Sequence, residues 1–156
     1  MQILEDDLSG DKTAGLLREH LDDMLEITPP GSVHALDIDA LRNPAITFWT
    51  AWEGDELLGC GALKELDAAS GEIKSMRTAA ARRGQGIGAR ILEHIIAEVT
   101  RRGYSCLKLE TGALPPFAPA RALYSRYGFE SCGPFAEYRY DPNSVFMSKK
   151  LASSGR

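Results

Sequence analysis

The stretch from Arg83 to Ala89, RGQGIGA, constrains the fold more than any other part of the chain. It lies between an apolar run that ends near Thr78 and a helical pattern that begins near Gly88. Glycines allow backbone turns that are closed to residues with a Cβ, so several N–H groups can converge on one anion. The positive end of a helix strengthens such a site. The stretch therefore predicts a diphosphate-binding turn between a strand and a helix.

Two familiar phosphate-binding loops fit this turn poorly. A Walker A loop needs Gly-Lys followed by Ser or Thr, whereas this chain has Gly88, Ala89 and Arg90, so an NTPase is disfavoured. A dinucleotide fingerprint has the spacing GxGxxG, whereas the glycines here are spaced GxGxG. The glycine turn by itself leaves the anion unidentified.

Composition indicates one soluble, globular domain. The chain has 156 residues, of which 44% are hydrophobic and 26% charged, enough for a core without staples. No apolar run reaches the ~18 residues of a membrane span, and the start MQILEDDLSGDK does not resemble a signal peptide. We therefore expect a cytoplasmic protein without membrane association.

Charge and cysteine usage argue against broad nucleic-acid binding and against a metal site. The net charge of −4 argues against broad nucleic-acid binding, although a local basic patch gathers near the glycines at Lys74, Arg77, Arg82 and Arg83. The cysteines and histidines lack metal-ligand spacing, so we expect no metal site and reduced, packed thiols at Cys60, Cys106 and Cys132.

Hydrophobic periodicity predicts a mixed α/β domain with one central sheet. The expected strands cover 2–4, 46–52, 56–64, 72–78, 105–110 and 145–150, and the expected helices cover 11–27, 32–41, 87–99 and 118–127. The three strands between 46 and 78 form an antiparallel meander, and the helix after Thr78 implies a parallel pair between the strands at 72–78 and 105–110. A ligand is expected at the carboxyl ends of that pair.

A second motif makes the interpretation specific. The segment ARALYSRYGFE carries Ala120, Leu123, Tyr124, Gly128 and Phe129. Together with RGQGIG, it resembles the GNAT superfamily of acetyl-CoA-dependent N-acetyltransferases. In that family R/Q-x-x-G-x-G/A forms the pyrophosphate loop, matched here by Arg83, Gly86 and Gly88. The resemblance extends over the whole order of elements.

The resemblance implies one GNAT-like domain over residues 1–156, with a mostly antiparallel sheet, one splayed parallel pair and helices on both faces. It divides the chain into a helical flap at about 11–43, an acetyl-CoA-binding core at about 45–130 and C-terminal strands at about 131–151. It also implies coenzyme contacts at Met76, Arg77, Thr78, Arg83, Gly84, Gln85, Gly86, Ile87, Gly88, Ala89 and Tyr124.

Acetyl transfer to an amine requires two proton transfers. An amine with a pKa near 10.4 must lose a proton before attack, and a coenzyme thiolate must gain one afterwards. The family motif assigns the second transfer to Tyr124. The first falls to Glu72, where the histone acetyltransferase branch carries its basic glutamate, or to Glu110, or to water alone. A backbone N–H near Met76 or Arg77 is expected to stabilise the oxyanion.

The acceptor is expected to enter between the first two helices and the loop before the last strand. His34, Glu110 and Tyr138 are candidate contacts there, and the compact chain favours a small-molecule amine over a protein or peptide amine. A non-catalytic acetyl-CoA sensor and a nucleotide-phosphate binder are alternatives. Family habit suggests a homodimer, with the core or an interface as alternative places for Trp49, Trp52 and Phe135.

Two positions depart from the family pattern. The V-x-P that often precedes the loop is replaced by Thr78, Ala79 and Ala80, and Phe117 stands where an Asn often precedes the tyrosine helix. The second change removes a helix cap and a coenzyme contact. We therefore expect a less stiff turn and weaker coenzyme binding, with the glycine turn itself intact.

Overall fold

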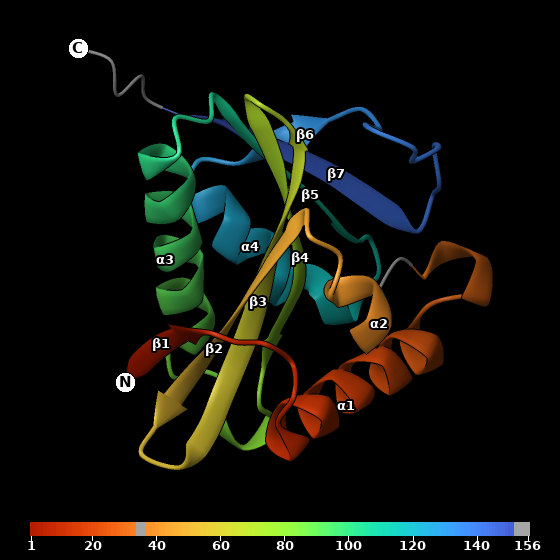
Figure 1. Ribbon diagram of the computed structural model, residues 1–156. Helices are drawn as coiled ribbons and strands as arrows, with labels where there is room; N and C mark the ends of the chain where they lie inside the picture. The colour runs from red at the N-terminus through yellow and green to blue at the C-terminus, as the bar shows by residue number, and fades with distance from the viewer. Residues whose placement is uncertain (34–36, 152–156) are drawn as a thin grey trace.

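The computed structural model describes residues 1–33 and 37–151, which form one sheet with helices packed on it (Figure 1). Within these residues seven strands lie in the order β1-β2-β3-β4-β5-β7-β6. The strands are β1 (Gln2–Glu5), β2 (Ile46–Glu53), β3 (Glu56–Asp67), β4 (Ser70–Thr78), β5 (Cys106–Gly112), β6 (Glu130–Cys132) and β7 (Ser144–Lys150). The α-helices are α1 (Asp11–Ile27), α2 (Ile38–Leu41), α3 (Ile87–Arg101) and α4 (Ala118–Arg126), with 3₁₀ turns at η1 (Pro30–Ser32), η2 (Ala80–Arg82) and η3 (Pro115–Phe117).

The pairing of the strands confirms the predicted mixed sheet. The pair β4 and β5 is parallel, and the other neighbours in the sheet are antiparallel. The parallel pairing runs from Ser70 opposite Cys106 to Ile73 opposite Leu109. Beyond that point β4 continues to Thr78 and β5 to Gly112, so the carboxyl ends of the two strands part.

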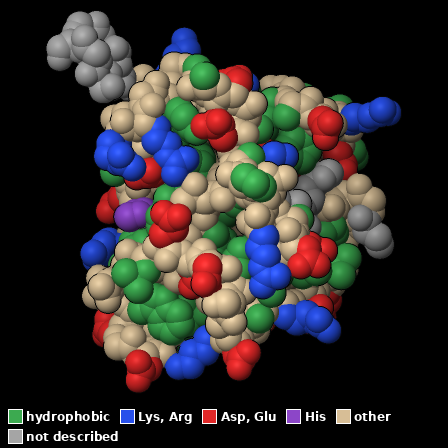
Figure 2. All heavy atoms as spheres, viewed as in Figure 1, with side chains coloured by type: hydrophobic (Ala, Val, Ile, Leu, Met, Phe, Trp, Pro, Cys, Tyr) green, Lys and Arg blue, Asp and Glu red, His purple; other side chains and the backbone are tan. Residues whose placement is uncertain are grey.

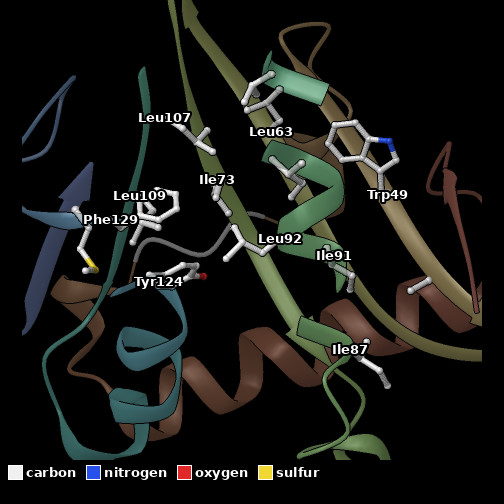
Figure 3. Close-up of a cluster of buried hydrophobic side chains, with 14 of the residues drawn as sticks. Trp49, Leu63, Ile73, Ile87, Ile91, Leu92, Leu107, Leu109, Tyr124 and Phe129 are labelled. Carbon is white, nitrogen blue, oxygen red and sulfur yellow. The ribbon is translucent and has the colours of Figure 1, made fainter. Parts of the chain in front are cut away.

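Helices cover both faces of the sheet (Figure 1). One buried cluster joins α3 and α4 to the sheet and includes Ile91, Leu92, Ile95 and Tyr124 (Figure 3). A second cluster joins Leu17 of α1 and Leu41 of α2 to the opposite face. Each helix buries an apolar stripe against the sheet, which is the pattern expected for a helix that covers one face.

Two glycines of β3 allow α3 to approach the sheet closely. A Cβ on Gly59 would lie 2.7 Å from the backbone oxygen of Arg77, and a Cβ on Gly61 would lie 2.8 Å from Cγ2 of Ile91. Real Cβ atoms do not pack at such distances, so a side chain at either position would displace the helix or the strand. The start of α3 is thereby fixed relative to β4.

The boundaries of several elements differ from those predicted, two of them for a clear physical reason. The strand β4 begins at Ser70 rather than at Glu72, because the parallel pairing with β5 extends it towards its N-terminus. The second helix begins at Ile38 rather than at Ser32, where Asp37 caps it by accepting a hydrogen bond of 2.8 Å from the Ala40 N–H.

The sequence left open whether Trp49, Trp52 and Phe135 lie in the core or at an interface. Trp49 and Phe135 are 4% and 8% exposed, so both lie in the interior. The indole N–H of Trp52 donates to the Thr50 hydroxyl at 2.8 Å.

In the described part of the chain, no helix combines the length and apolar character needed to cross a membrane. On the face in Figure 2, acidic and basic side chains are interspersed.

Candidate active site

The glycine turn opens to the surface at the start of α3. Gly84 and Gly86 have φ of 79° and 81°, the left-handed region that glycine adopts without strain. A Cβ at either position would meet nothing within 4 Å. Gly86 is the N-cap of α3 and no side chain caps the helix, so its first N–H groups face outward. These features suit a diphosphate bound by backbone N–H groups.

Gly88 differs from the other two glycines in its surroundings. A Cβ there would lie 3.5 Å from Cδ2 of Leu123 and 3.7 Å from the Thr78 hydroxyl. Gly88 therefore lies where α3, α4 and the end of β4 converge. This packing joins the glycine turn to the helix that carries Tyr124.

Two arginines flank the turn and have different partners. Nε of Arg82 donates to Oε2 of Glu56 at 2.6 Å, and Arg82 also contacts Oε1 of the same carboxylate. The side chain of Arg83 is 57% exposed and lies 3.7 Å from Asp23. Arg82 therefore ties the turn to the β2–β3 hairpin, while the side chain of Arg83 is largely exposed.

The segment of β4 beyond the parallel pair contains a bulge. Ala62 pairs with Lys74 and Cys60 with Arg77, so Ser75 and Met76 together oppose Gly61, and Ser75 has a φ of 54°. A bulge leaves one residue outside the ladder and bends the strand. The oxyanion donor expected near Met76 or Arg77 thus lies at or next to this bulge, and its role stays a prediction.

Met76 and Arg77, which follow Ser75 in β4, place their side chains in different surroundings. Met76 packs against the apolar cluster under α3. The buried guanidinium of Arg77 contacts α1, at 2.6 Å from both Glu19 and Asp23. The side chain of Arg77 secures α1 to β4. The coenzyme contact expected at Arg77, which its backbone can make, stays a prediction. The pair Glu19 and Asp23, one helical turn apart, was the signal in the sequence that could have suggested a shared cation.

Tyr124 projects from α4 into the apolar cluster beside Leu109 and Phe129 (Figure 3). Gly128, with a φ of 90°, ends α4 and returns the chain, so that the Phe129 ring packs edge-on against the tyrosine with centroids 5.7 Å apart. Burial, and secondly the charge of Glu110, raises the pKa of the Tyr124 hydroxyl. The phenol therefore keeps its proton at neutral pH, and it is a weaker acid than an exposed tyrosine.

Phe117 is the N-cap residue of α4, at the position where the family pattern often has an Asn. Its ring occupies the space next to Gly112, because a Cβ on Gly112 would lie 2.1 Å from Cδ2 of the ring. No side chain caps α4. Arg121 donates from Nη1 to the Gly112 carbonyl at 2.6 Å, which fixes the helix against the end of β5.

Glu72 lies on the face of the sheet opposite α3, and it is 2% exposed. Its Oε2 accepts hydrogen bonds from the Tyr138 hydroxyl at 2.6 Å and from Nζ of Lys74 at 3.1 Å. Lys74 also donates to the Tyr138 oxygen at 2.9 Å. Burial first, and then the carboxylate of Glu72, raises the pKa of Tyr138. These three residues form what we call the Glu72 triangle.

Glu110 is the carboxylate next to the point where β4 and β5 part. It follows Leu109, the last residue of β5 that pairs with β4. Its charge contributes to the raised pKa of both Tyr124 and Tyr138. The structure brings Tyr138 to Glu72, and it places Tyr124 in the cluster under α3 and α4. His34, also expected near the acceptor, lies outside the described residues.

Two further groups, the buried thiol of Cys60 and the partly buried imidazole of His20, complete the electrostatics of this region. Burial raises the pKa of the Cys60 thiol to about 12, in keeping with the packed, reduced thiol that was expected. His20 of α1 was not predicted as a site residue. Burial, and then the charge of Arg77, lowers its pKa from 6.5 to about 4, so its imidazole is neutral at pH 7.

Comparison with known proteins identifies the family. The model of the acetyltransferase (GNAT) family matches residues 7–129. The uncharacterised N-acetyltransferase YsnE of Bacillus subtilis (strain 168) is 57% identical over 151 residues, which cover 97% of this chain and 100% of YsnE. An IAA acetyltransferase of Azospirillum brasilense is 41% identical over 137 residues, which cover 86% of this chain and 88% of the relative.

Solved structures share the fold. A candidate acyl-CoA N-acyltransferase from Klebsiella pneumoniae superposes with a TM-score of 0.78 at 28% identity, over 97% of each chain. A GNAT acetyltransferase from Elizabethkingia anophelis with acetyl-CoA bound superposes with a TM-score of 0.67 at 20% identity, over 96% of this chain and 97% of that one. The chain therefore belongs to the acetyltransferase (GNAT) family, and it is an acyltransferase of a family that uses acetyl-CoA.

The neutral state of His20 predicts how stability changes with pH. Between pH 6.5 and about 4 the unfolded chain binds a proton that the folded imidazole does not, so folding stability falls as the pH falls. From pH 7 to 5 the loss due to His20 is about 2 kcal/mol. We expect His20→Gln to flatten the pH dependence of the free energy of unfolding, measured by urea denaturation, by this amount. Parallel curves for the two proteins would contradict the burial argument.

Proposed function

We propose that this protein transfers an acetyl group from acetyl-CoA to the amine of a small molecule, by direct attack within a ternary complex. The observation that carries the proposal is the open glycine turn at the start of α3, beside the parted ends of β4 and β5. A diphosphate group matches the glycine turn. Beyond their last pair, β4 and β5 no longer bond each other, so their backbone groups are left for an extended ligand.

The residues that would hold the coenzyme are those of the turn. Backbone N–H groups from Gly84 to Ala89 and the exposed guanidinium of Arg83 supply donors for the diphosphate. When bound, acetyl-CoA supplies an activated thioester. The lack of a side chain at Gly86 matters most, because it lets the backbone approach the phosphates.

Proton transfers by the chain's own residues complete the proposal. Tyr124, kept protonated by burial, donates its phenolic proton to the coenzyme thiolate late in the reaction. A carboxylate near the parted strands, Glu72 or Glu110, accepts the proton of the acceptor amine through water. The N–H spared by the bulge at Ser75 donates to the oxyanion. No covalent intermediate with the protein is required.

The assay that tests the proposal follows free thiol while the pure protein is incubated with acetyl-CoA. The panel contains small amines of several classes, a peptide with a free N-terminus and a peptide with an internal lysine. We expect turnover on a small amine. Turnover on a peptide alone would overturn the acceptor class, and coenzyme binding without turnover on any amine would favour a sensor. Thermal stabilisation by ATP or NAD but not by CoA would indicate a nucleotide-phosphate binder.

The glycine turn can be tested separately from catalysis. We expect Gly86→Leu to weaken CoA binding, measured by calorimetry, by about tenfold or more, because its side chain would cover the N–H groups. Gly103→Leu is the matched control, since Gly103 has a φ of 82°, also meets nothing within 4 Å and lies at the other end of α3. Equal loss of binding in both variants would remove the claim.

Tyr124→Phe tests the proton donor. We expect kcat to fall about a hundredfold with coenzyme binding unchanged, because the hydroxyl acts late in the reaction. Tyr127→Phe is the control, because its hydroxyl bonds Glu93 on the surface and lies at the end of the same helix. A Tyr124→Phe enzyme with wild-type kcat would refute the role of the phenol.

A further inference from the structure

The connection between β6 and β7, residues 133–143, lies on the face of the sheet opposite α3 and is held there by aromatic packing. The rings of Phe135, Tyr138 and Phe146 contact one another with centroids 5.2 to 5.9 Å apart. At the end of the connection, Asn143 donates from Nδ2 to the Ser32 hydroxyl at 3.3 Å, which joins it to the turn after α1. We call residues 133–143 the β6–β7 loop.

The Glu72 triangle ties this loop to β4. The side chains of Glu72 and Lys74 are only 3% and 9% exposed, and the hydroxyl of Tyr138 lies within hydrogen-bond distance of both. The bonds are chemically consistent, since the ammonium donates to the phenol and the phenol donates to the carboxylate. A buried ion pair is costly unless further hydrogen bonds satisfy its remaining atoms, and Tyr138 supplies such a bond.

The same contacts hold Glu72 inside the protein. Its Oε2 is shared between an ammonium and a phenol, both of which donate to it. Because its side chain is only 3% exposed, these contacts suit it to holding Tyr138 rather than to approaching an amine.

We propose that Glu72 is a positioning residue, which with Lys74 holds Tyr138 and so fixes the β6–β7 loop as a wall of the acceptor pocket. The proton of the amine then passes to Glu110 or to water alone. The inference rests on the proposed acetyl transfer, because the acceptor pocket is defined by that reaction. Glu72 thus orders the pocket, and the proton transfer falls to another group.

Tyr138→Phe is the most direct test, because it removes one hydroxyl and keeps the aromatic ring. With the best amine from the panel, we expect the acceptor KM to rise about fivefold, kcat to stay within about twofold and CoA binding to be unchanged. Glu72→Gln should give the same pattern, and the double variant should be no worse than either single one. Tyr140→Phe, in the same loop but 81% exposed, is the matched control.

A second readout needs no turnover. Amide hydrogen exchange within residues 133–143 should be about tenfold faster in Tyr138→Phe than in the wild type or in Tyr140→Phe. If no amine is acetylated, the proposed function fails, and the exchange measurement still decides whether the triangle orders the loop. This measurement also covers the case in which Glu72→Gln does not fold.

Two results would overturn the inference. One is a fall in kcat of about a hundredfold in Glu72→Gln, with loss of the ionisation that limits the rate at low pH, while Tyr138→Phe keeps the wild-type profile. Glu72 would then be the base. The other is wild-type acceptor KM and wild-type exchange in Tyr138→Phe, which would show that the hydroxyl does not order the loop.

Discussion

The parting of β4 and β5 after the Ile73–Leu109 pair is the constraint on which the rest of this structure depends. Parallel strands cannot be joined by a short turn, so α3 carries the chain back and begins at the carboxyl ends of both strands. The bulge at Ser75 bends β4 away from its neighbour. As a result, the glycine turn follows the carboxyl end of β4, and Glu110 lies on β5 just beyond the point where the two strands part.

The two faces of the sheet differ in chemical character. The face under α3 and α4 is apolar, and it holds Tyr124 in an environment that keeps the phenol protonated. The opposite face buries charges in pairs: Glu72 with Lys74, and Arg77 with two carboxylates of α1. A buried charge without a partner costs several kcal/mol, so these pairs fix which segments meet on that face. In the proposed reaction, the apolar face would serve the acetyl donor and the paired charges would order the acceptor side.

Much of the donor side could be predicted from local patterns. The spacing RGQGIG implied a turn at the start of a helix, and YSRYGF implied a tyrosine followed by a helix end, because positive φ at Gly86 and Gly128 is a local requirement. The acceptor side could not be predicted in this way. Tyr138 reaches Glu72 across 66 positions, and Arg77 reaches Glu19 across 58. Phe117 looked like a lost cap, and the structure shows that it fills the space beside Gly112.

The sequence by itself determined the order of the elements, the glycine turn and the helix of Tyr124, since hydrophobic period and glycine conformation act over a few neighbouring residues. It also indicated the family, which the comparisons established. Only the tertiary structure decided that Glu72 is buried and bonded to Tyr138, and that Arg77 secures α1. The reason is physical: burial and the pairing of charges depend on which distant segments come together, and no local pattern contains that information.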